Sequence, residues 1–571
     1  MCFNFIFVRY FEKTYKKNST FVFIHRPKVT KILQKHMEYR TLKQIFTNSV
    51  KKFSKLPALS MFERESMTYG ELGERVAYVS DLLRGAGLGA GDKVVLLSSS
   101  MPNWGVCYFA AVNAGMVIVP IMPEFSSAEL DMLIAHSEAK ALCVSDKLYT
   151  KLSEETISRM NIVIRTKNLA VLSQTCTDHT EPVEPKPEDL AAIIYTSGTT
   201  SAPKGVMLTH KALATQVEIC YTMQNVDEDD IFLSILPLAH TYECSLGLLL
   251  PISHGSQVVY MDRPPTASAL MPAFKSVRPT IILSVPLIME KIFRSQVKSK
   301  FTKSKAMSAL YSVGIIRKFF HSIAGKRLKK VFGGRVRFFG IGGAKVERET
   351  ERFMREAKFP YAIGYGLTET APLLFGSAPA DTRLQAVGLA GKYVEGKLID
   401  VNPETGEGEL VVKTPCIMEG YYKNPEATRE AFTEDGWFRT KDLCIFDEKG
   451  YLVIKGRANN MIVGSTGENI YPEEIESVIN THRLVTESIV VADGGSLVAL
   501  VTLDKEKLEE ALSDFKDNVH IKYEELMKEI REYVNARVAK FARVSKIEEQ
   551  KDGFEKTPSM KIKRFLYKRD K

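Results

Sequence analysis

Short apolar runs alternate with longer stretches of helical spacing along most of the chain. Between residues 68 and 150, YGELGERVAYVSDLLRGAG places apolar residues every three or four positions, whereas KVVLLSS, VIVPI and ALCVS are short and almost wholly apolar. The alternation resumes downstream at AAIIYT, IFLSILPL, QVVYM, TIILSVP and RVRFFGIGG. Buried parallel strands covered by helices give this pattern. We therefore predict that the bulk of the chain is α/β.

The pattern changes after YLVIKGR, which ends at Arg457. The next strand-like runs (NMIVGS, SIVVAD, SLVALVTLD) alternate with charged helices such as PEEIESVIN, whose Pro472 suits a first helical turn. A chain of 571 residues is also too long for a single core. We predict a large N-terminal domain of helix-covered mixed sheets over residues 37–458. A small, mobile α+β domain follows over residues 459–571.

Residues 1–36 differ from the rest in composition. They contain eight Lys or Arg and one acidic residue, and so carry +7 of the chain's net charge of +10. They have neither the long apolar run nor the small-residue cleavage site of a signal peptide. Helical spacing begins at Met37. Two interpretations stay open: a start-site artefact upstream of Met37, or a basic, aromatic arm that contacts a membrane.

Charge is also concentrated in residues 291–337, which hold fourteen Lys or Arg and no Asp or Glu. The small remaining charge of the chain as a whole argues against nucleic acid as a partner. Within the segment, an i, i+3, i+4, i+7 helical face is formed by Ile316, Phe319, Phe320 and Ile323. The segment is either a solvated basic hairpin that this stripe packs on the core, or a surface for peripheral contact with an anionic membrane.

The eight cysteines are scattered without any CxxC pair. This spacing indicates neither a zinc site nor a disulfide framework, and it is typical of a reducing compartment. No stretch of ~18 uninterrupted apolar residues is present, so no membrane span is expected. We predict a cytoplasmic protein, with peripheral membrane association as the open alternative.

Residues 195–205 read YTSGTTSAPKG and follow a strand-like run. Hydroxyls can donate hydrogen bonds, glycines allow close backbone approach, and a lysine adds positive charge, as a phosphate-binding loop requires. The order nevertheless differs from GxxxxGK[ST], in which the lysine directly follows the second glycine. Taken alone, the run is more typical of a Ser/Thr-rich surface turn.

Further motifs follow in a fixed order downstream. They are YAIGYGLTET (361–370), GWFRTKDL (436–443), IKGRANNMIVGSTGENIYPEEIE (454–476) and KTPSMKIKR (556–564). Together with the first run, they resemble the signature series of the AMP-forming adenylating superfamily. LPLAHTYE (236–243) and GYYKNPEAT (420–428) look most like its long-chain fatty acyl-CoA synthetase branch. The resemblance extends from about Met37 to the C-terminus.

This resemblance implies activation of a fatty acid, expected to be long-chain, by ATP. The products would be acyl-AMP and pyrophosphate, followed by acyl-CoA, with Mg²⁺ as cofactor and coenzyme A as co-substrate. Two alternatives stay open: transfer to an acyl carrier protein, and a non-catalytic protein that binds an acyl-adenylate or a nucleotide. The second is suggested by departures from the family pattern at Ser201, Lys441, Asn459, Asn460 and Met560.

The resemblance also assigns roles around the nucleotide. The phosphate loop would use Thr196, Ser197, Gly198, Thr199, Thr200 and Lys204. Adenine and ribose would be bound by Gly343, Ala344, Tyr365, Gly366, Asp442 and Arg457. Tyr365 would stack on adenine and Asp442 would hold both ribose hydroxyls. Thr368 would contact the α-phosphate, and Glu369 would hold Mg²⁺.

The remaining roles concern the acyl group and the domain movement. Lys561 would bridge the attacking carboxylate and the phosphate. Asn459 would be the hinge, and Gly467 would approach the pantetheine tunnel or simply form a turn before Pro472. His240 would gate the acyl pocket or be a core residue. The following CSLGLLLPI would line that pocket or be plain core.

Overall fold

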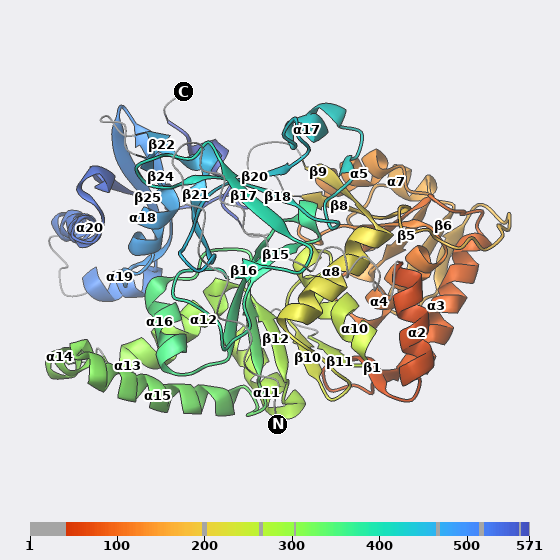
Figure 1. The fold of residues 1–571 in the computed structure, drawn as a ribbon, viewed down its shortest axis with the longest axis horizontal. Coiled ribbons are helices and arrows are strands. Elements are labelled where there is room, and N and C mark those ends of the chain that lie inside the picture. The colour runs from red at the N-terminus through yellow and green to blue at the C-terminus, as the bar shows by residue number, and fades with distance from the viewer. Residues whose placement is uncertain are drawn as a thin grey trace, which may run out of the picture.

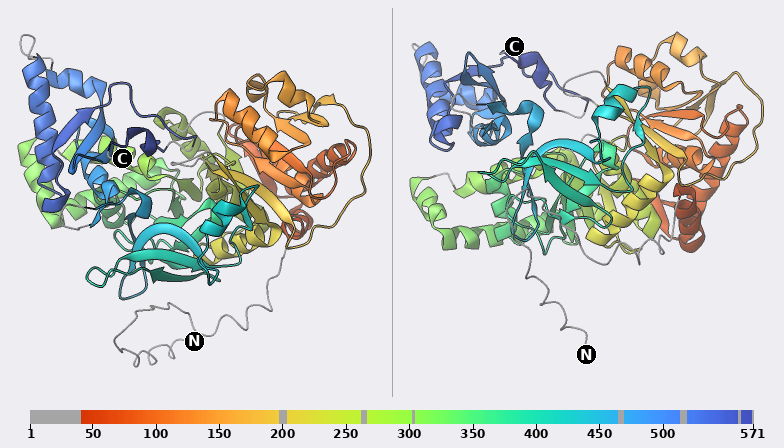
Figure 2. Two further views of the ribbon diagram at one scale, coloured as in Figure 1. Left: turned by 90° about the horizontal axis from the view of Figure 1, so that it is seen from above. Right: turned by 45° about the horizontal axis from the view of Figure 1, so that its top comes forward.

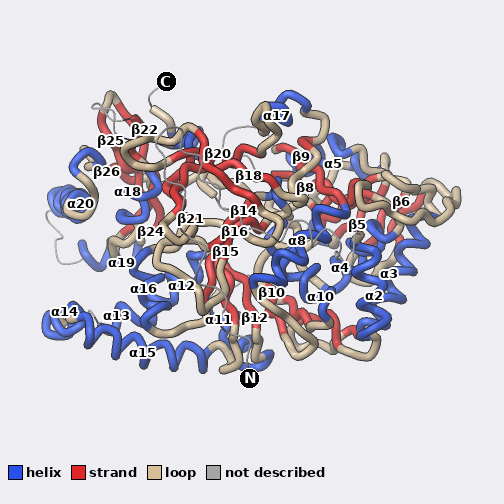
Figure 3. Tube along the Cα trace, viewed as in Figure 1, coloured by secondary structure: helices blue, strands red, loops and turns tan. Residues whose placement is uncertain are grey.

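The computed structural model describes residues 41–196, 203–261, 266–301, 304–463, 469–512, 519–558 and 561–569. Two large sheets and one smaller sheet build the N-terminal part, and two short sheets build the C-terminal part (Figure 1). Strands gather in the interior and helices lie mostly outside them (Figure 3). Among the described residues, no helix combines the length and the apolar character that a bilayer span requires.

The first large sheet has a parallel centre and antiparallel ends. In order, its strands are β19 (Gly420–Tyr421), β9 (Lys204–Thr209), β8 (Leu190–Thr196), β4 (Val117–Pro120), β3 (Lys93–Leu97), β5 (Ala141–Val144), β6 (Ile162–Arg165) and β7 (Val171–Gln174). The strands predicted at KVVLLSS, VIVPI, ALCVS and AAIIYT are confirmed. The antiparallel pair β8 and β9 brings the two ends of the predicted phosphate loop together.

The second large sheet is parallel from β1 to β14 and antiparallel at both edges. In order, its strands are β16 (Leu389–Ala390), β15 (Leu373–Gly376), β14 (Tyr361–Gly366), β13 (Phe338–Ile341), β12 (Ile281–Ser284), β10 (Ile231–Ser234), β11 (Gln257–Tyr260), β1 (Pro57–Met61) and β2 (Met67–Thr68). The YGLTE motif therefore begins at the end of β14, the last parallel strand of this sheet.

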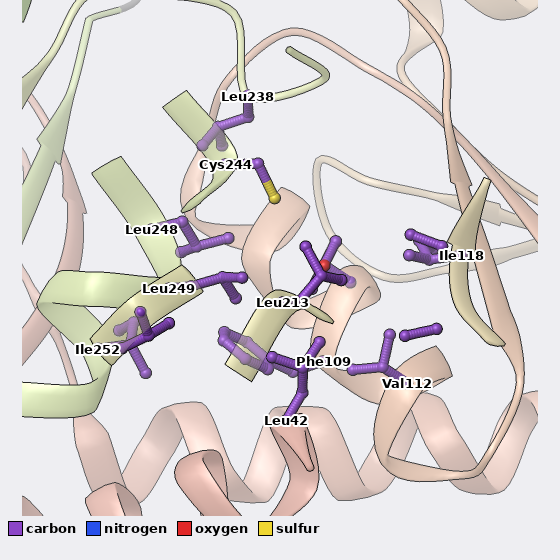
Figure 4. Close-up of a cluster of buried hydrophobic side chains, with 14 of the residues drawn as sticks. Leu42, Phe109, Val112, Ile118, Leu213, Leu238, Cys244, Leu248, Leu249 and Ile252 are labelled. Carbon is purple, nitrogen blue, oxygen red and sulfur yellow. The ribbon is translucent and has the colours of Figure 1, made fainter. Parts of the chain in front are cut away.

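Helices cover these sheets. The first begins after Thr41, whose side chain forms a capping box with Gln44. In chain order they are α2 (Leu42–Phe53), α3 (Tyr69–Arg84), α4 (Pro102–Asn113), α5 (Ser127–Ser137), α6 (Asp146–Tyr149), α7 (Glu154–Ser158), α8 (His210–Met223), α9 (Thr241–Glu243), the π-helix η1 (Cys244–Leu249), α10 (Leu250–His254), α11 (Ala267–Val277), α16 (Arg348–Glu356) and α17 (Pro425–Glu430). The main core lies where α2, α4, α8 and α10 meet (Figure 4).

The basic segment is helical and lies along one edge of the molecule (Figure 2). Its elements are α12 (Pro286–Ile292), the π-helix η2 (Phe293–Lys298), α13 (Ser299–Phe301), α14 (Lys305–Ser312) and α15 (Gly314–Val331). Of the two interpretations of the stripe at Ile316, Phe319, Phe320 and Ile323, packing on the protein applies to only part of it. Phe320 stacks on Phe301 with ring centroids 4.6 Å apart, but Phe319 and Ile323 are exposed. The contacts of His321 and Leu328, both buried, set the rotation of α15 instead.

The smaller sheet of the N-terminal part is antiparallel and comprises β17 (Glu395–Ile399), β18 (Gly408–Lys413), β20 (Phe438–Phe446) and β21 (Leu452–Arg457). A single 3-10 turn, η4 (Ala458–Asn460), leads from β21 to the C-terminal part.

That part has its own core, built on β22 (Ile462–Val463), β23 (Asn469–Ile470), α18 (Pro472–Ile479), β24 (Val485–Asp493), β25 (Ser496–Leu503), α19 (Lys505–Leu512), α20 (Val519–Asn535) and β26 (Lys546–Glu549). The predicted fold class is confirmed. The domain boundary at residue 458 stays a prediction, and the change of sheet falls next to it.

Candidate active site

Asp442 is a buried member of the predicted nucleotide-binding residues, at 3% exposed. It lies on β20 directly opposite Arg457 on β21. Its Oδ2 accepts a 2.6 Å hydrogen bond from the Tyr365 hydroxyl, and its Oδ1 lies 3.1 Å from Arg457 Nε. Burial raises the pKa of Asp442, while Arg457, Tyr365 and Lys561 oppose that rise. Both carboxylate oxygens are therefore held by residues of other predicted motifs.

Lys561 joins this cluster from the C-terminal part. Its backbone is fixed by Thr557, whose N–H donates to the Lys561 carbonyl at 2.7 Å. Surrounding protein and the charge of Arg457 lower the Lys561 pKa, whereas Asp442 and Glu369 raise it. The side chain itself is exposed. Lys561 is therefore within electrostatic range of Asp442, Glu369 and Arg457, while the residue is reached by solvent.

Glu369 lies in the 3-10 turn η3 (Thr368–Thr370), directly after β14 and Leu367. Its Oε1 accepts a 2.9 Å hydrogen bond from the hydroxyl of Tyr421. The Lys204 ammonium lies 5.0 Å from the centroid of the same tyrosine ring. Tyr421 thus connects the predicted metal carboxylate with the lysine of the phosphate loop. Sequence reasoning missed it, because only the pairing of β19 with β9 brings GYYKNPEAT to this place.

The described part of the phosphate loop consists of its two ends. Thr196 closes β8 and lies opposite Lys204, the first residue of β9, and its hydroxyl donates to the Lys204 carbonyl at 3.4 Å. A Cβ at Gly205 would come within 2.9 Å of Ile193, so the strand needs glycine here. The other predicted residues, Ser197, Gly198, Thr199 and Thr200, lie outside the described residues, as does Gly467.

The segment predicted to border adenine follows β13 and is exposed. Gly343 has φ +86°, in the left-handed region, with no atom within 4 Å of a Cβ built there. Ala344 and Lys345 are exposed beside it. Lys345 Nζ lies 3.6 Å from Glu474 on α18, so this segment makes an ion pair with the C-terminal part. Gly366, in contrast, is sterically required, since a Cβ would lie 1.7 Å from the Pro372 carbonyl oxygen.

Lys441 directly precedes Asp442 where the family generally has glycine. Its φ is +58°, in the left-handed region that glycine occupies without cost. For a residue with a Cβ, this conformation costs roughly 1–2 kcal/mol. The backbone therefore keeps the geometry that the family pattern implies, even though the residue departs from that pattern.

His240 caps α9, where its Nδ1 accepts a 3.2 Å hydrogen bond from the Tyr242 backbone N–H. Burial, assisted by the charge of Lys561, lowers the His240 pKa to about 4, so the imidazole is neutral at pH 7. Two residues later, Tyr242 lines an apolar cavity of about 40 Å³. Tyr242 is therefore an aromatic residue at the cavity that sequence reasoning did not single out.

The cavity lies between the second large sheet and the helices α8, η1 and α10. Its lining includes Cys220, Met223, Phe232, Tyr242, Leu246, Leu250, Ile281, Leu283, Phe338, Gly340, Ile341, Ala362, Ile363 and Leu373. The run CSLGLLLPI is part of the main core throughout, and two of its residues, Leu246 and Leu250, also line the cavity. Its core members Cys244, Leu248 and Ile252 are labelled in Figure 4.

The predicted hinge, Asn459, is exposed in η4. Its neighbour Asn460 donates a 2.7 Å hydrogen bond to Glu473 Oε1 on α18. Glu473 in turn acts electrostatically on Asp442 and Arg457. The short turn therefore lies between the charged cluster and the C-terminal part, and a hinge role for Asn459 stays a prediction.

Two family models match this chain. The model described as AMP-binding enzyme matches residues 46–422, and that described as AMP-binding enzyme C-terminal domain matches residues 474–561. Long chain acyl-CoA synthetase 7, peroxisomal, of Arabidopsis thaliana is 31% identical over 546 residues, covering 86% of this chain and 77% of the relative. The long-chain-fatty-acid–CoA ligase of Salmonella typhimurium is 29% identical over 521 residues, covering 83% and 87%.

The fold is also found in solved structures. One is O-succinylbenzoate coenzyme A synthetase from Bacillus subtilis in complex with ATP and magnesium ion. It superposes with a TM-score of 0.72 at 22% identity, over 91% of this chain and 98% of that chain. The likeness therefore covers both the N-terminal and the C-terminal parts.

Proposed function

The chain belongs to the AMP-binding enzyme family, and on this basis we propose that it activates a fatty acid with ATP and transfers the acyl group to coenzyme A. The observation that carries the proposal is the cluster of Asp442, Arg457, Glu369 and Lys561. These residues come from separate motifs and meet close to an apolar cavity. The names of the two relatives support a long-chain acid as substrate and coenzyme A, rather than an acyl carrier protein, as acceptor.

In the first step, a carboxylate oxygen of the acid bonds to the α-phosphorus while the bond between that phosphorus and the α,β-bridging oxygen breaks. Pyrophosphate leaves with that oxygen. Lys561 can attract the incoming carboxylate and offset the negative charge that develops on the phosphoryl oxygens. Lys204, at the end of the phosphate loop, offers positive charge to the leaving group.

Asp442 is the proposed ribose ligand, since each of its two oxygens can accept a hydrogen bond from a ribose hydroxyl. One of them now accepts from the Tyr365 hydroxyl. A bound ribose would replace that donor and free Tyr365 to lie against the adenine. Burial raises the pKa of Asp442, and the positive charge of Arg457 is the largest influence that opposes this rise and favours the ionised carboxylate.

Glu369 is the proposed Mg²⁺ ligand. Mg²⁺ is commonly held by one or two carboxylates together with phosphate oxygens, and a single oriented carboxylate fits that requirement. When bound, Mg²⁺ would neutralise negative charge on the phosphate oxygens. The Tyr421 hydroxyl orients Glu369, and the structural relative in complex with ATP and magnesium supports the proposal.

Thioester formation requires space for the thiol of coenzyme A. We assign this to a rotation of the C-terminal domain, residues 459–571, about Asn459, which brings Gly467 to the acyl-adenylate. The ion pair between Lys345 and Glu474 would break in that movement. Lys561 would then leave the cluster, which confines its role to the first step.

The acyl chain is proposed to occupy the cavity behind Tyr242. A volume of about 40 Å³ holds only a few water-sized groups, so a long acyl chain requires rearrangement of the lining. Tyr242 packs over Gly340 and Gly342, where no Cβ obstructs its ring. Neutral His240 adds no charge at the mouth of this apolar site.

Mass spectrometry of the products from acids of C2 to C20, incubated with ATP and coenzyme A, tests the function. We expect acyl-CoA and AMP in a 1:1 ratio, with the long acids converted best. Omission of coenzyme A should leave acyl-AMP as the only acyl product. Formation of ADP, or conversion of acetate alone, would contradict the proposal.

A further inference from the structure

The hairpin of α14 and α15 is fixed to the body of the protein along one side. Arg317 pairs with Glu356 of α16 at 2.9 Å, and His321 Nδ1 lies 2.7 Å from the same carboxylate group. His321 and Leu328 are 1% and 8% exposed. These contacts set the rotation of α15 about its axis. The opposite side of α15 therefore faces away from the protein.

That outward side begins with large apolar side chains. Ile315, Phe319 and Ile323 are 84%, 63% and 39% exposed, and their spacing of four residues aligns them along the helix. Leu310 of α14 and Val313 in the turn are a further 44% and 48% exposed. Single exposed apolar residues are ordinary in soluble proteins, but a group of them marks a binding surface.

Exposed basic residues follow these apolar side chains along the same side of α15. Lys326 and Lys330 follow Ile323 by three and seven residues and are exposed, as are Lys318 and Arg327. Other basic residues of the segment have acidic partners: Arg294 with Glu347, Lys298 with Glu349, and Arg317 with Glu356. In the described part of the chain, none of Lys318, Lys326, Arg327 and Lys330 forms an ion pair. Their charges are therefore uncompensated.

This combination fits the surface of an anionic bilayer better than water or a protein groove. Apolar side chains of an interfacial helix enter the boundary between head groups and acyl chains, while flanking Lys and Arg meet the lipid phosphates. A helix meant for solvent would carry polar residues at positions 315, 319 and 323. The basic residues would find no neutralising partner in an apolar protein groove.

In the sequence, the hairpin also lies between two strands that line the acyl cavity. It is inserted between β12 and β13, which contribute Ile281, Leu283 and Phe338 to the cavity lining. A surface that contacts lipid would therefore be attached directly to the site proposed for an acyl chain. This link rests on the proposed function, whereas the docking surface itself does not.

We propose that the hairpin of α14 and α15 docks the protein reversibly on anionic lipid bilayers. Ile315, Phe319 and Ile323 enter the interface. Lys318, Lys326, Arg327 and Lys330 contact the anionic head groups. The partner is thus a membrane surface rather than another protein.

Sedimentation of the full chain with vesicles tests this proposal without any substrate. We expect binding to vesicles of 70% phosphatidylcholine and 30% phosphatidylserine, at least tenfold less binding to pure phosphatidylcholine, and loss of binding at high salt. Equal binding to both vesicles, or none to either, would overturn the proposal. Self-association on light scattering that Phe319→Ser abolishes would reassign the surface to a second copy of the chain, and would also overturn it.

A charge variant and a matched control locate the binding. The variant changes Lys318, Lys326, Arg327 and Lys330 to Gln. The control removes the same number of exposed charges elsewhere, by changing Lys51, Lys167, Lys505 and Lys540 to Gln. We expect at least tenfold weaker vesicle binding for the variant and less than twofold for the control. Equal loss in both would show non-specific attraction and contradict docking through the hairpin.

Phe319→Trp gives a positional readout that does not depend on loss of function. The two native tryptophans, Trp104 and Trp437, are 0% and 6% exposed, so they are shielded from lipid. Lipids brominated on their acyl chains should quench the fluorescence of the introduced indole and leave the wild-type signal unchanged. Absence of quenching in vesicle-bound protein would overturn the insertion of α15.

Discussion

Two buried carboxylates on different sides of the candidate site show how surroundings decide the charge of the same chemical group. Asp442 is 3% exposed and Glu243, three residues after His240, is 1% exposed. Asp442 faces the Arg457 guanidinium and the charge of Lys561, which oppose the effect of burial on its pKa. Among the described residues, the Ser234 hydroxyl donates a 2.6 Å hydrogen bond to Glu243 and no cation pairs with it, and burial raises the Glu243 pKa to about 8.

The comparison separates a polar half of the site from an apolar half. In the polar half, the Arg457 guanidinium and the charge of Lys561 act on Asp442, and Lys561 also interacts electrostatically with Glu369, so that negative charge is favoured near the phosphates. In the apolar half the one buried acid holds its proton at neutral pH, and the surroundings of the acyl cavity stay uncharged. A fatty acid has the same division between a charged end and an apolar chain.

The largest expected effect tests the cation of the polar half. Lys561→Ala should lower the rate of acyl-AMP formation by about 100-fold or more, because a positive donor to the transition state is lost. Conversion of preformed acyl-AMP to acyl-CoA should be unchanged. Pyrophosphate exchange and single-turnover thioester formation measure the two steps separately.

The control is Lys568→Ala, which removes an exposed charge from the same tail and should leave both steps unchanged. Equal losses in both half-reactions of Lys561→Ala would contradict the assignment of Lys561 to adenylation.

Asp442→Asn should have the next largest effect, since it keeps the shape of the side chain and removes its charge. Hydrogen bonds to a charged group contribute roughly 1.5–3 kcal/mol, so kcat/KM for ATP should fall by about 10- to 100-fold. The KM for the fatty acid should change by less than about twofold. Steady-state kinetics with each substrate varied in turn distinguish these effects, and an equal change in both KM values would argue against a ribose contact.

Glu243→Gln likewise replaces a carboxylate by an amide, but in the apolar half. We expect it to leave activity unchanged and to alter the pH dependence of stability. The folded state holds the Glu243 proton up to about pH 8, whereas an unfolded chain releases it near pH 4.5. Wild-type stability should therefore fall as the pH rises through this window, by about 2 kcal/mol between pH 6.5 and pH 8.

Because glutamine cannot lose a proton, the variant should lack this part of the pH dependence. Thermal melting at pH 5, 6.5 and 8 measures it, and activity at pH 7 should be retained. A variant with the wild-type pH dependence would show that Glu243 is ionised in the folded protein.

The patterns that predict the fold are local, which is why the strands β3, β4 and β5 and the helix α3 were predictable. The two halves of the site were not equally predictable. Asp442, Arg457 and Glu369 belong to short polar motifs, and such motifs stand out against an apolar background. The cavity residues Leu246 and Leu250 have the same character as their core neighbours, so only tertiary structure separates them.

Contacts between elements were also beyond prediction. Tyr421 reaches Glu369 through the pairing of β19 with β9, and no local pattern encodes that pairing. The sequence left open whether Phe319 and Ile323 pack on the core or face outward, because periodicity alone does not say which side of a helix the protein covers; both are exposed. His321, a polar residue, fixes that side, because its Nδ1 lies 2.7 Å from Glu356 of α16.

The smallest expected effect concerns the orientation of the Glu369 carboxylate in the polar half. Tyr421→Phe removes the hydroxyl that holds Glu369 and should lower the rate of acyl-AMP formation about tenfold at limiting Mg²⁺. The adjacent Tyr422→Phe is a matched control, because its hydroxyl also binds a glutamate, Glu138, away from the cluster. Rates measured over a range of Mg²⁺ concentrations should show partial recovery of the Tyr421 variant, and equal losses in both variants would contradict a role in orienting Glu369.

Fatty-acid-dependent exchange of labelled pyrophosphate into ATP, measured without coenzyme A, tests the central claim most directly. It isolates acyl-AMP formation, the step in which the polar half must bind ATP while the apolar half holds the chain of the fatty acid. The account predicts exchange that requires both a fatty acid and Mg²⁺ and that becomes more efficient with long chains. Exchange in the absence of any acid, or none with acids from C2 to C20, would contradict it.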